Sequence, residues 1–448
     1  MENLPVAREE AHDYLEQEVY NSLTSEEKLL LKTIAIFRIP ETVDAFDTVN
    51  KLDDLNETLN NLIHRFLVNE IGINTYSVHE IIRDYSLSDV RRRKILRSYH
   101  ERAAEYYLSL DDDPEHVLEA AYHFDEAGMK EKSAEIIINN AGDLIAKGFW
   151  AMIENRLQSA IKSFRRKTQP QAIQLVALAH LKIGGLYEEK GDYDLALRHT
   201  IQSLNFSRKI KDISGIFNSN NRIANIYEDK NEIEEAKEYN EKCLKMAESQ
   251  KNDIWKAIAM GTRGILLGND DKEQKLEYYL KSLKIFEDQN SISNITAMCA
   301  NIANFYAEMG NYEKSYEFIK RALELTKERN AFYEIAKAKI DMADIYYNDP
   351  KKPVSIDSII NCLKEALETY EKVGHIRGTA SILTKIGNIY RVEEDFKSAI
   401  DNYRRAVAIY SSLNQQSEEA ELNTKIGLCY SAQSKNPVIF KLFIHRTI

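Results

Sequence analysis

The chain has 448 residues, of which 44% are hydrophobic and 29% are charged, so it is too long for one compact core and too apolar to be largely disordered. Its net charge of −11 argues against a nucleic-acid backbone or an anionic membrane surface as the partner of the chain as a whole. Only 16 Gly and 7 Pro are present, which predicts an all-α chain.

The opening segment, MENLPVAREEAHDYLEQEVY, carries charges where a secretory signal peptide needs its apolar core. No stretch reaches the roughly 20 apolar residues of a membrane span. The four cysteines, at positions 243, 299, 362 and 429, are too far apart to resemble a zinc or redox motif. We therefore expect a cytoplasmic protein with buried thiols, no metal and no cofactor, in which residues 1–21 form a helix or a linker.

Residues 22–95 have the pattern of a small separate domain. LTSEEKLLLKTIAIF opens with a capping box, Thr24 to Glu27, ahead of an apolar helix face. ETVDAFDTV and LNETLNNLIHRFLV predict two further helices, and LVNEIGINTYSV alternates around Gly72 like a short β-hairpin. Three helices followed by a hairpin predict a winged-helix domain.

The triplet Val78-His79-Glu80 within YSVHEIIRDYSL resembles the Met-His-Asp signature in the winged-helix domain of STAND signal-transduction ATPases. That resemblance implies that His79 contacts the β-phosphate of bound ADP. It also implies that residues 96–170, which include YHERAAEYYLSL, are degenerate helical hairpins connecting the winged helix to a repeat array. The chain contains no Gly-x-x-x-x-Gly-Lys-Ser/Thr loop, so any nucleotide-binding domain would lie upstream or on a partner.

A repeat of about 40 residues occupies residues 171–434. Tyrosine recurs in the same setting, with Leu267 in the one gap, at Tyr187, Tyr227, Tyr306, Tyr346, Tyr390 and Tyr430. A small residue stands three positions before each of these, and a second row of small residues follows, from Ser203 to Ala406. Two rows predict two closely packed helices per unit, joined by turns in which Gly191 and Gly310 take positive φ.

These residues resemble the tetratricopeptide repeat, or TPR, as in IANFYAEMGNYEKSYEFIKRAL. The resemblance implies a right-handed superhelix (an α–α solenoid) of about six and a half repeats, with residues 435–448 as a cap or tail. It also implies a concave groove that binds a protein or peptide and no catalytic residues.

In TPR proteins, an asparagine after the first small residue often holds the backbone of a bound peptide. The matching positions here carry Asn225, Asn304 and Asn388, and Asp344 replaces the asparagine in the fifth unit. Three positions earlier stand Arg222, Asn301 and Lys385, which could engage ligand carboxylates. Each of these residues could equally be a solvated polar position on an amphipathic helix.

The leading hypothesis is therefore the sensor part of a STAND-type ATPase, and a free-standing TPR adaptor is the alternative. A winged-helix transcription regulator is a third reading, since Arg91, Arg92, Arg93, Lys94 and Arg97 form a basic cluster. Residues 1–100 nevertheless hold 12 Lys and Arg against 18 Asp and Glu, so nucleic-acid binding is not expected. His79-Glu80 also begins a His-Glu-x-x-His zinc motif, but Arg83 replaces the second histidine.

Overall fold

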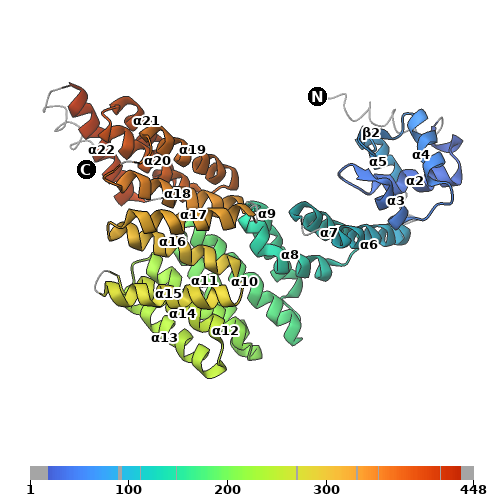
Figure 1. Cartoon of the computed structure of the whole chain (residues 1–448). Coiled ribbons are helices and arrows are strands. Elements are labelled where there is room, and N and C mark those ends of the chain that lie inside the picture. Colours follow the sequence, from blue (N-terminus) through green and yellow to red (C-terminus); the bar gives the residue numbers. More distant parts are fainter. Residues whose placement is uncertain are drawn as a thin grey trace. The chain divides into compact units, whose positions relative to one another are not determined.

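The computed structural model describes residues 19–88, 93–110, 113–147, 149–268, 271–328, 331–351, 353–413 and 415–434. Helices dominate this part of the chain, as predicted, and a small sheet accompanies them (Figure 1). The chain divides into two compact units between Asn140 and Ala141, a point inside helix α8 (Lys130–Ala146). None of the helices in the described residues is both long and apolar enough to cross a bilayer.

Unit 1 begins with helices and a three-stranded sheet. The elements in chain order are η2 (Tyr20–Ser22), α2 (Ser25–Ala35), β1 (Glu41–Thr42), α3 (Val43–Val49), α4 (Leu55–His64), β2 (Asn69–Gly72), β3 (Thr75–Ser77), α5 (Glu80–Leu87), α6 (Arg93–Ser109) and α7 (Pro114–Glu126). Both β1 and β2 pair antiparallel with β3, which gives the sheet order β1-β3-β2. The order of elements is compatible with a winged-helix-like unit, although the sequence pattern did not predict β1.

The predicted capping box starts the first helix of this unit. The hydroxyl of Thr24 accepts a hydrogen bond from the Glu27 amide at 3.1 Å, and the Glu27 carboxylate accepts one from the Thr24 amide at 2.7 Å. The core beside this helix contains the fully buried side chains of Leu30, Phe37 and Phe46. Local capping and the apolar face thus act together to fix α2.

Unit 2 contains α9 and then an array of helical hairpins. The bounds are α9 (Trp150–Phe164), α10 (Pro170–Lys190), α11 (Tyr193–Ile210), α12 (Ile213–Asp229), α13 (Ile233–Gln250), α14 (Asp253–Leu266), α15 (Lys272–Asp288), α16 (Ile292–Glu308), α17 (Tyr312–Glu328), α18 (Phe332–Asn348), α19 (Ile356–Val373), α20 (Ile376–Val392), α21 (Phe396–Ser412) and α22 (Gln416–Ser434). The six hairpins α10–α11 to α20–α21, followed by the single helix α22, confirm the predicted solenoid (Figure 1).

The turns of the hairpins have the expected chemistry. Gly191 and Gly310 have φ values of 77° and 71°, as predicted, in the left-handed region that a side chain disfavours. Aspartate or asparagine caps many of the following helices by accepting a bond from a backbone amide three residues ahead, as at Asp192, Asp212, Asn252, Asp271 and Asp395. Each repeat therefore contains its own signals for ending one helix and starting the next.

Small residues allow the two helices of a hairpin to approach closely. A Cβ atom added at Gly264 would lie 2.6 Å from the ring of Tyr279, and one at Gly387 would lie 2.7 Å from the ring of Tyr403. Ala224 and Ala303 are fully buried at the matching positions. The small-residue rows seen in the sequence are thus helix–helix contacts, as predicted.

Three of the predicted features lie wholly or partly outside the described residues. Most of the predicted N-terminal helix or linker, residues 1–18 of 1–21, lies outside the described residues. The predicted C-terminal cap or tail, 435–448, lies outside them entirely, and so do Arg91 and Arg92 of the basic cluster.

Candidate functional site: the central cavity of the repeat array

A cavity of about 860 Å³, here called the central cavity, lies inside unit 2. Its lining includes residues from the first helix of all six hairpins, α10, α12, α14, α16, α18 and α20. This is the face on which the TPR resemblance placed a ligand.

The central cavity brings together three of the residues singled out in the sequence. Arg222 and Asn225 on α12 and Asn301 on α16 all line it. The guanidinium of Arg222 forms an ion pair with Glu188 on the preceding hairpin. The amides of Asn225 and Asn301 can each donate and accept a hydrogen bond, as a peptide backbone requires.

The other four predicted groove residues line neither this cavity nor the smaller one beside it, and their side chains have partners within the protein. Lys385 contacts Asp344 at 2.6 Å, and the hydroxyl of Tyr403 donates to Asn388 at 2.8 Å. Asn304 hydrogen-bonds to Asp341. The asparagine row is therefore divided between cavity residues and residues that connect neighbouring helices.

Several lining residues were missed by the sequence reasoning. Asn221 precedes Asn225 by one helical turn, and Asn294 precedes Asn301 by two, so each shares a helix face with a predicted residue. On α18, Lys337 likewise precedes Asp344 by two helical turns. Helical periodicity applied to the predicted residues could have found all three.

A second cavity of about 390 Å³ adjoins the first. It shares Glu189, Arg222 and Lys337 with the central cavity and is also lined by Lys182 and Asp341. The two cavities together therefore have charged groups of both signs along their common wall.

Carboxylates gather where α10 and α12 end at the central cavity. Enclosure by the surrounding helices, together with the neighbouring Glu228, raises the pKa of Asp229 to about 6. The pKa of Glu228 is also raised, by enclosure and by the charge of Glu188. These acids are costly to ionise together, so this end of the cavity favours a ligand that is not itself an anion.

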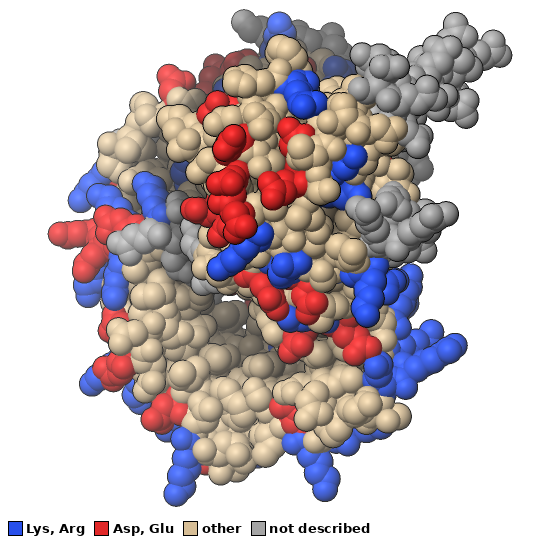
Figure 2. Space-filling model, turned by 90° about the vertical axis from the view of Figure 1, so that its right-hand side faces the viewer, with Lys and Arg blue, Asp and Glu red and all other residues tan. Residues whose placement is uncertain are grey.

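The outer surface carries both charges. On the face drawn in Figure 2, Asp and Glu side chains gather in the upper half, while Lys and Arg side chains are spread around them. On this face the basic side chains do not form the continuous positive surface that a phosphate backbone requires, which agrees with the net charge of −11.

His79, the residue matched to the STAND signature, lies at the start of α5. It is exposed, and its Nδ1 accepts a bond of 3.4 Å from the amide of Ile81, so His79 acts as the N-cap of this helix. Val78 beside it is buried, with 5% of its surface exposed.

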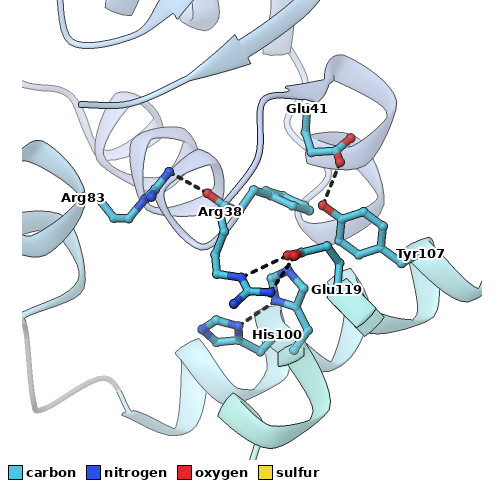
Figure 3. Close-up of polar contacts among 8 residues, drawn as sticks. Arg38, Glu41, Arg83, His100, Tyr107 and Glu119 are labelled. Carbon is cyan, nitrogen blue, oxygen red and sulfur yellow. Dashed lines mark hydrogen bonds and ion pairs between the residues drawn. The ribbon is translucent and has the colours of Figure 1, made fainter. Parts of the chain in front are cut away.

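Polar contacts link helices α6 and α7 to the rest of unit 1, and Glu41, Tyr107 and Glu119 among them are buried (Figure 3). Arg38 reaches Glu119 at 2.5 Å, and the hydroxyl of Tyr107 donates to Glu41 at 2.7 Å. Arg83, which replaces the second histidine of the His-Glu-x-x-His pattern, donates to the backbone carbonyl of Phe37 at 2.8 Å. Hydrogen bonds between these elements hold them in one arrangement, in agreement with the single compact unit that contains them.

Comparison with protein families finds TPR-type helical hairpins in unit 2. A tetratricopeptide repeat family model matches residues 217–250 and 296–329, and the model of the soluble NSF attachment protein family, SNAP, matches residues 331–439.

Two curated relatives share part of the chain. The 43 kDa receptor-associated protein of the synapse of Tetronarce californica is 20% identical over 253 residues, which are 56% of this chain and 60% of that protein. The kinesin light chain-related protein 3 of Arabidopsis thaliana is 28% identical over 153 residues, covering 32% of this chain and 24% of its own length. The chain thus spans less than two thirds of either relative.

One solved structure extends the similarity to nearly the whole chain. It is a STAND protein with a tetratricopeptide repeat sensor from Pyrococcus horikoshii, with a TM-score of 0.55 and 16% identity, covering 97% of this chain and 64% of that one. At this identity the likeness concerns the fold. Unit 2 therefore contains tetratricopeptide repeats, and the fold of the chain resembles that of a STAND protein with a TPR sensor.

Proposed function

We propose that this protein binds an extended peptide in the central cavity and serves as the sensor and regulatory part of a STAND-type ATPase. A nucleotide-binding domain upstream or on a partner would supply the ATPase, since the chain itself has no phosphate-binding loop. The protein would act in the cytoplasm, where its four free cysteines stay reduced.

The observation that carries peptide binding is the convergence of polar side chains in one cavity. Asn225 and Asn301 belong to hairpins two and four, yet both line the same space, and Asn221 and Asn294 extend the polar lining of the same helices. Amide side chains on the second and fourth hairpins can meet the donors and acceptors of an extended peptide backbone. The apolar side chains of Ile258 and Met298 lie among them and offer contacts for a peptide side chain.

Affinity capture followed by isothermal titration calorimetry tests this function. The full chain is used to capture peptides from a synthetic library, and a captured peptide is then titrated into the wild type and into Asn225→Ala/Asn301→Ala. We expect the double variant to bind at least tenfold more weakly, because two polar contacts are lost at roughly 1 kcal/mol each. The matched control is Asn205→Ala on α11, whose side chain is exposed and which does not line the cavity. Equal affinity of the wild type and the double variant would remove the cavity as the peptide site.

The STAND role rests on the triplet at His79 and on the order of a winged-helix-like unit before a repeat array. It predicts that the chain associates with a nucleotide-binding domain more tightly when that domain holds ADP, and that His79→Ala weakens this association. The test is a pull-down of a nucleotide-binding domain encoded beside this chain, with ADP and without nucleotide. If the association depends neither on the nucleotide nor on His79, the STAND role is excluded. The proposed peptide binding is not affected by that result.

The alternative is a free-standing TPR adaptor that needs no nucleotide. The names of the two curated relatives, a receptor-associated protein and a kinesin light chain-related protein, favour it. An adaptor would bind its peptide with the same affinity whether or not a nucleotide-binding domain is present, and calorimetry in both conditions separates the two.

A further inference from the structure

A small cavity of about 160 Å³, here called the unit 1 cavity, lies between helices α2, α5 and α6. All three helices belong to unit 1. Cavities that hold drug-sized ligands are usually larger than roughly 300 Å³, whereas a cavity of about 150 Å³ is large enough to hold benzene. The unit 1 cavity therefore has room for one molecule of about the size of a benzene ring.

Helix α2 makes one wall of the unit 1 cavity basic. Lys28 and Lys32, one helical turn apart, both line it, and their ammonium groups lie 5.3 Å and 5.8 Å from the centre of the Tyr20 ring. Among the described residues, no carboxylate pairs with Lys28. None of the described residues that line this cavity is acidic. The charges at the cavity therefore favour an anion.

Helix α5 contributes a buried hydroxyl that is not used within the described part of the chain. Ser86 lines the cavity and is 1% exposed, and its Oγ atom has no hydrogen-bond partner there. A buried polar group without a partner costs free energy, and native structures contain few of them. Because a serine hydroxyl can donate to a carboxylate oxygen, Ser86 adds a hydrogen-bond donor to the positive charge of α2.

Helix α6 makes the opposing wall apolar. Ile95, Leu96 and Tyr99 line the cavity, and Leu29 on α2 adds a fourth apolar side chain. Tyr99 is 5% exposed and Ile95 is 48% exposed, so this wall extends from the interior to the surface. Apolar walls with a few polar groups are the usual composition of a small-molecule site. The ligand should therefore combine an anionic group with an apolar body.

The basic cluster seen in the sequence lies next to this cavity. Lys94 and Arg97 are exposed on α6, and in the sequence they flank the lining residues Ile95 and Leu96. Exposed charges act over about 8 Å at physiological ionic strength, so both add to the positive potential that attracts an anion here.

From this arrangement we infer that unit 1 contains a binding site for a small organic carboxylate with an apolar body of ring size, the class to which benzoate belongs. The ammonium of Lys28 and the hydroxyl of Ser86 hold the carboxylate, and the apolar body lies against Leu96 and Tyr99. Ser86 and the N-cap His79 are at opposite ends of α5, so this site is separate from the nucleotide contact expected at His79. The inference does not depend on peptide binding in unit 2.

Fluorine NMR on the full chain tests the role of charge. The chain is titrated with para-fluorobenzoate and with para-fluorobenzamide, which has nearly the same shape and no charge. We expect the carboxylate to bind about tenfold more tightly than the amide, and we expect Lys28→Met to remove this preference. Lys51→Met is the matched control, because Lys51 is exposed in unit 1 and does not line the cavity. Equal binding of the two compounds, or a preference that survives in Lys28→Met, would overturn the site.

Two further variants locate the bound carboxylate. Ser86→Ala should weaken the binding of para-fluorobenzoate several-fold, and it should not lower the stability measured by urea denaturation, because the hydroxyl has no partner within the protein. Asn225→Ala/Asn301→Ala, in the central cavity, should leave this binding unchanged. Binding that falls in the central-cavity variant and not in Ser86→Ala would overturn the assignment to unit 1. The titration of captured peptides is a separate measurement, so either result leaves the proposed peptide binding to its own test.

Discussion

The hydroxyl of Tyr403 donates a hydrogen bond of 2.8 Å to the side-chain oxygen of Asn388, and Tyr403 is fully buried. Asn388 occupies the same repeat position as Asn225, which lines the central cavity. One sequence position thus serves packing in the sixth hairpin and faces the candidate ligand site in the second.

This difference predicts unequal effects of the same substitution. Asn388→Ala should lower the free energy of unfolding by about 1–3 kcal/mol, because it leaves a buried hydroxyl without its partner. Asn225→Ala should change it by less than about 0.5 kcal/mol, as is usual for a position in contact with water. Urea denaturation of both variants measures the two values, and equal losses would contradict the division of the asparagine row.

Two glycines provide a matched test of the contact between α10 and α20. Gly191 and Gly310 both end a helix with positive φ, so alanine at either should cost roughly 1–2 kcal/mol. At Gly310 an added Cβ has open space, whereas at Gly191 it would collide with the side chain of Arg377. Gly191→Ala should therefore lose about 1 kcal/mol more, since Arg377 must release the Gly191 carbonyl. In a Trp255→Phe background it should also increase the acrylamide quenching of Trp150, which is buried beside the start of α20. Equal stability and equal quenching of the two alanine variants would contradict the contact between Arg377 and Gly191.

Asp341 predicts a pH dependence in the second cavity. Enclosure raises its pKa from 3.8 to about 6, against the opposing effects of Lys337 and Asn304. The folded state therefore binds more protons than the unfolded state between these values, and the stability due to Asp341 is lost as the pH rises through 6. Asp341→Asn should be more stable than the wild type at pH 8, and this gain should vanish near pH 4.

Asp344→Asn is the control for this prediction, because Asp344 lies on the same helix and pairs with Lys385. Urea denaturation at pH 8, 6 and 4 gives the comparison. A gain for Asp341→Asn that does not change with pH would rule out the raised pKa as its cause.

The histidine pair of unit 1 predicts the opposite pH dependence. His100 and His123 meet through their Nδ1 atoms at 2.8 Å, both are buried, and burial lowers the pKa of His100 from 6.5 to about 4. The unfolded state binds more protons in this window, so unit 1 should lose stability as the pH falls from 6.5 to 4, on the order of 3 kcal/mol. Hydrogen exchange of unit 1 peptides at pH 6.5 and 4.5, corrected for intrinsic rates, measures this loss. His100→Leu/His123→Leu should remove the dependence, and its persistence in that variant would assign it to other groups.

Much of the fold could be predicted because its signals are local and repeated. The 40-residue spacing of Tyr187 and its equivalents, the positive φ of Gly191 and Gly310, and the capping box at Thr24 are each contained within a few residues. The two-residue strand β1 gave no such signal, because Glu41 and Thr42 pair with β3 across more than thirty residues.

The candidate site was harder to predict because it depends on distant contacts. Arg222, Asn225 and Asn301 could be singled out from their repeat positions, but nothing local distinguishes them from Asn388 and Lys385, which have partners within the protein. The contact of Trp150 with Tyr333 and His375 joins residues far apart in the chain, and no periodic pattern in the sequence predicts it.

Site-specific photocrosslinking tests the central claim most directly. A photoreactive phenylalanine analogue at Asn294, which lines the central cavity, is compared with one at Leu280, which is 41% exposed on α15 and does not line it. Our account predicts that a captured linear peptide crosslinks to position 294 and not to position 280. Crosslinking at 280 alone, with the affinity of both labelled proteins unchanged, would contradict it.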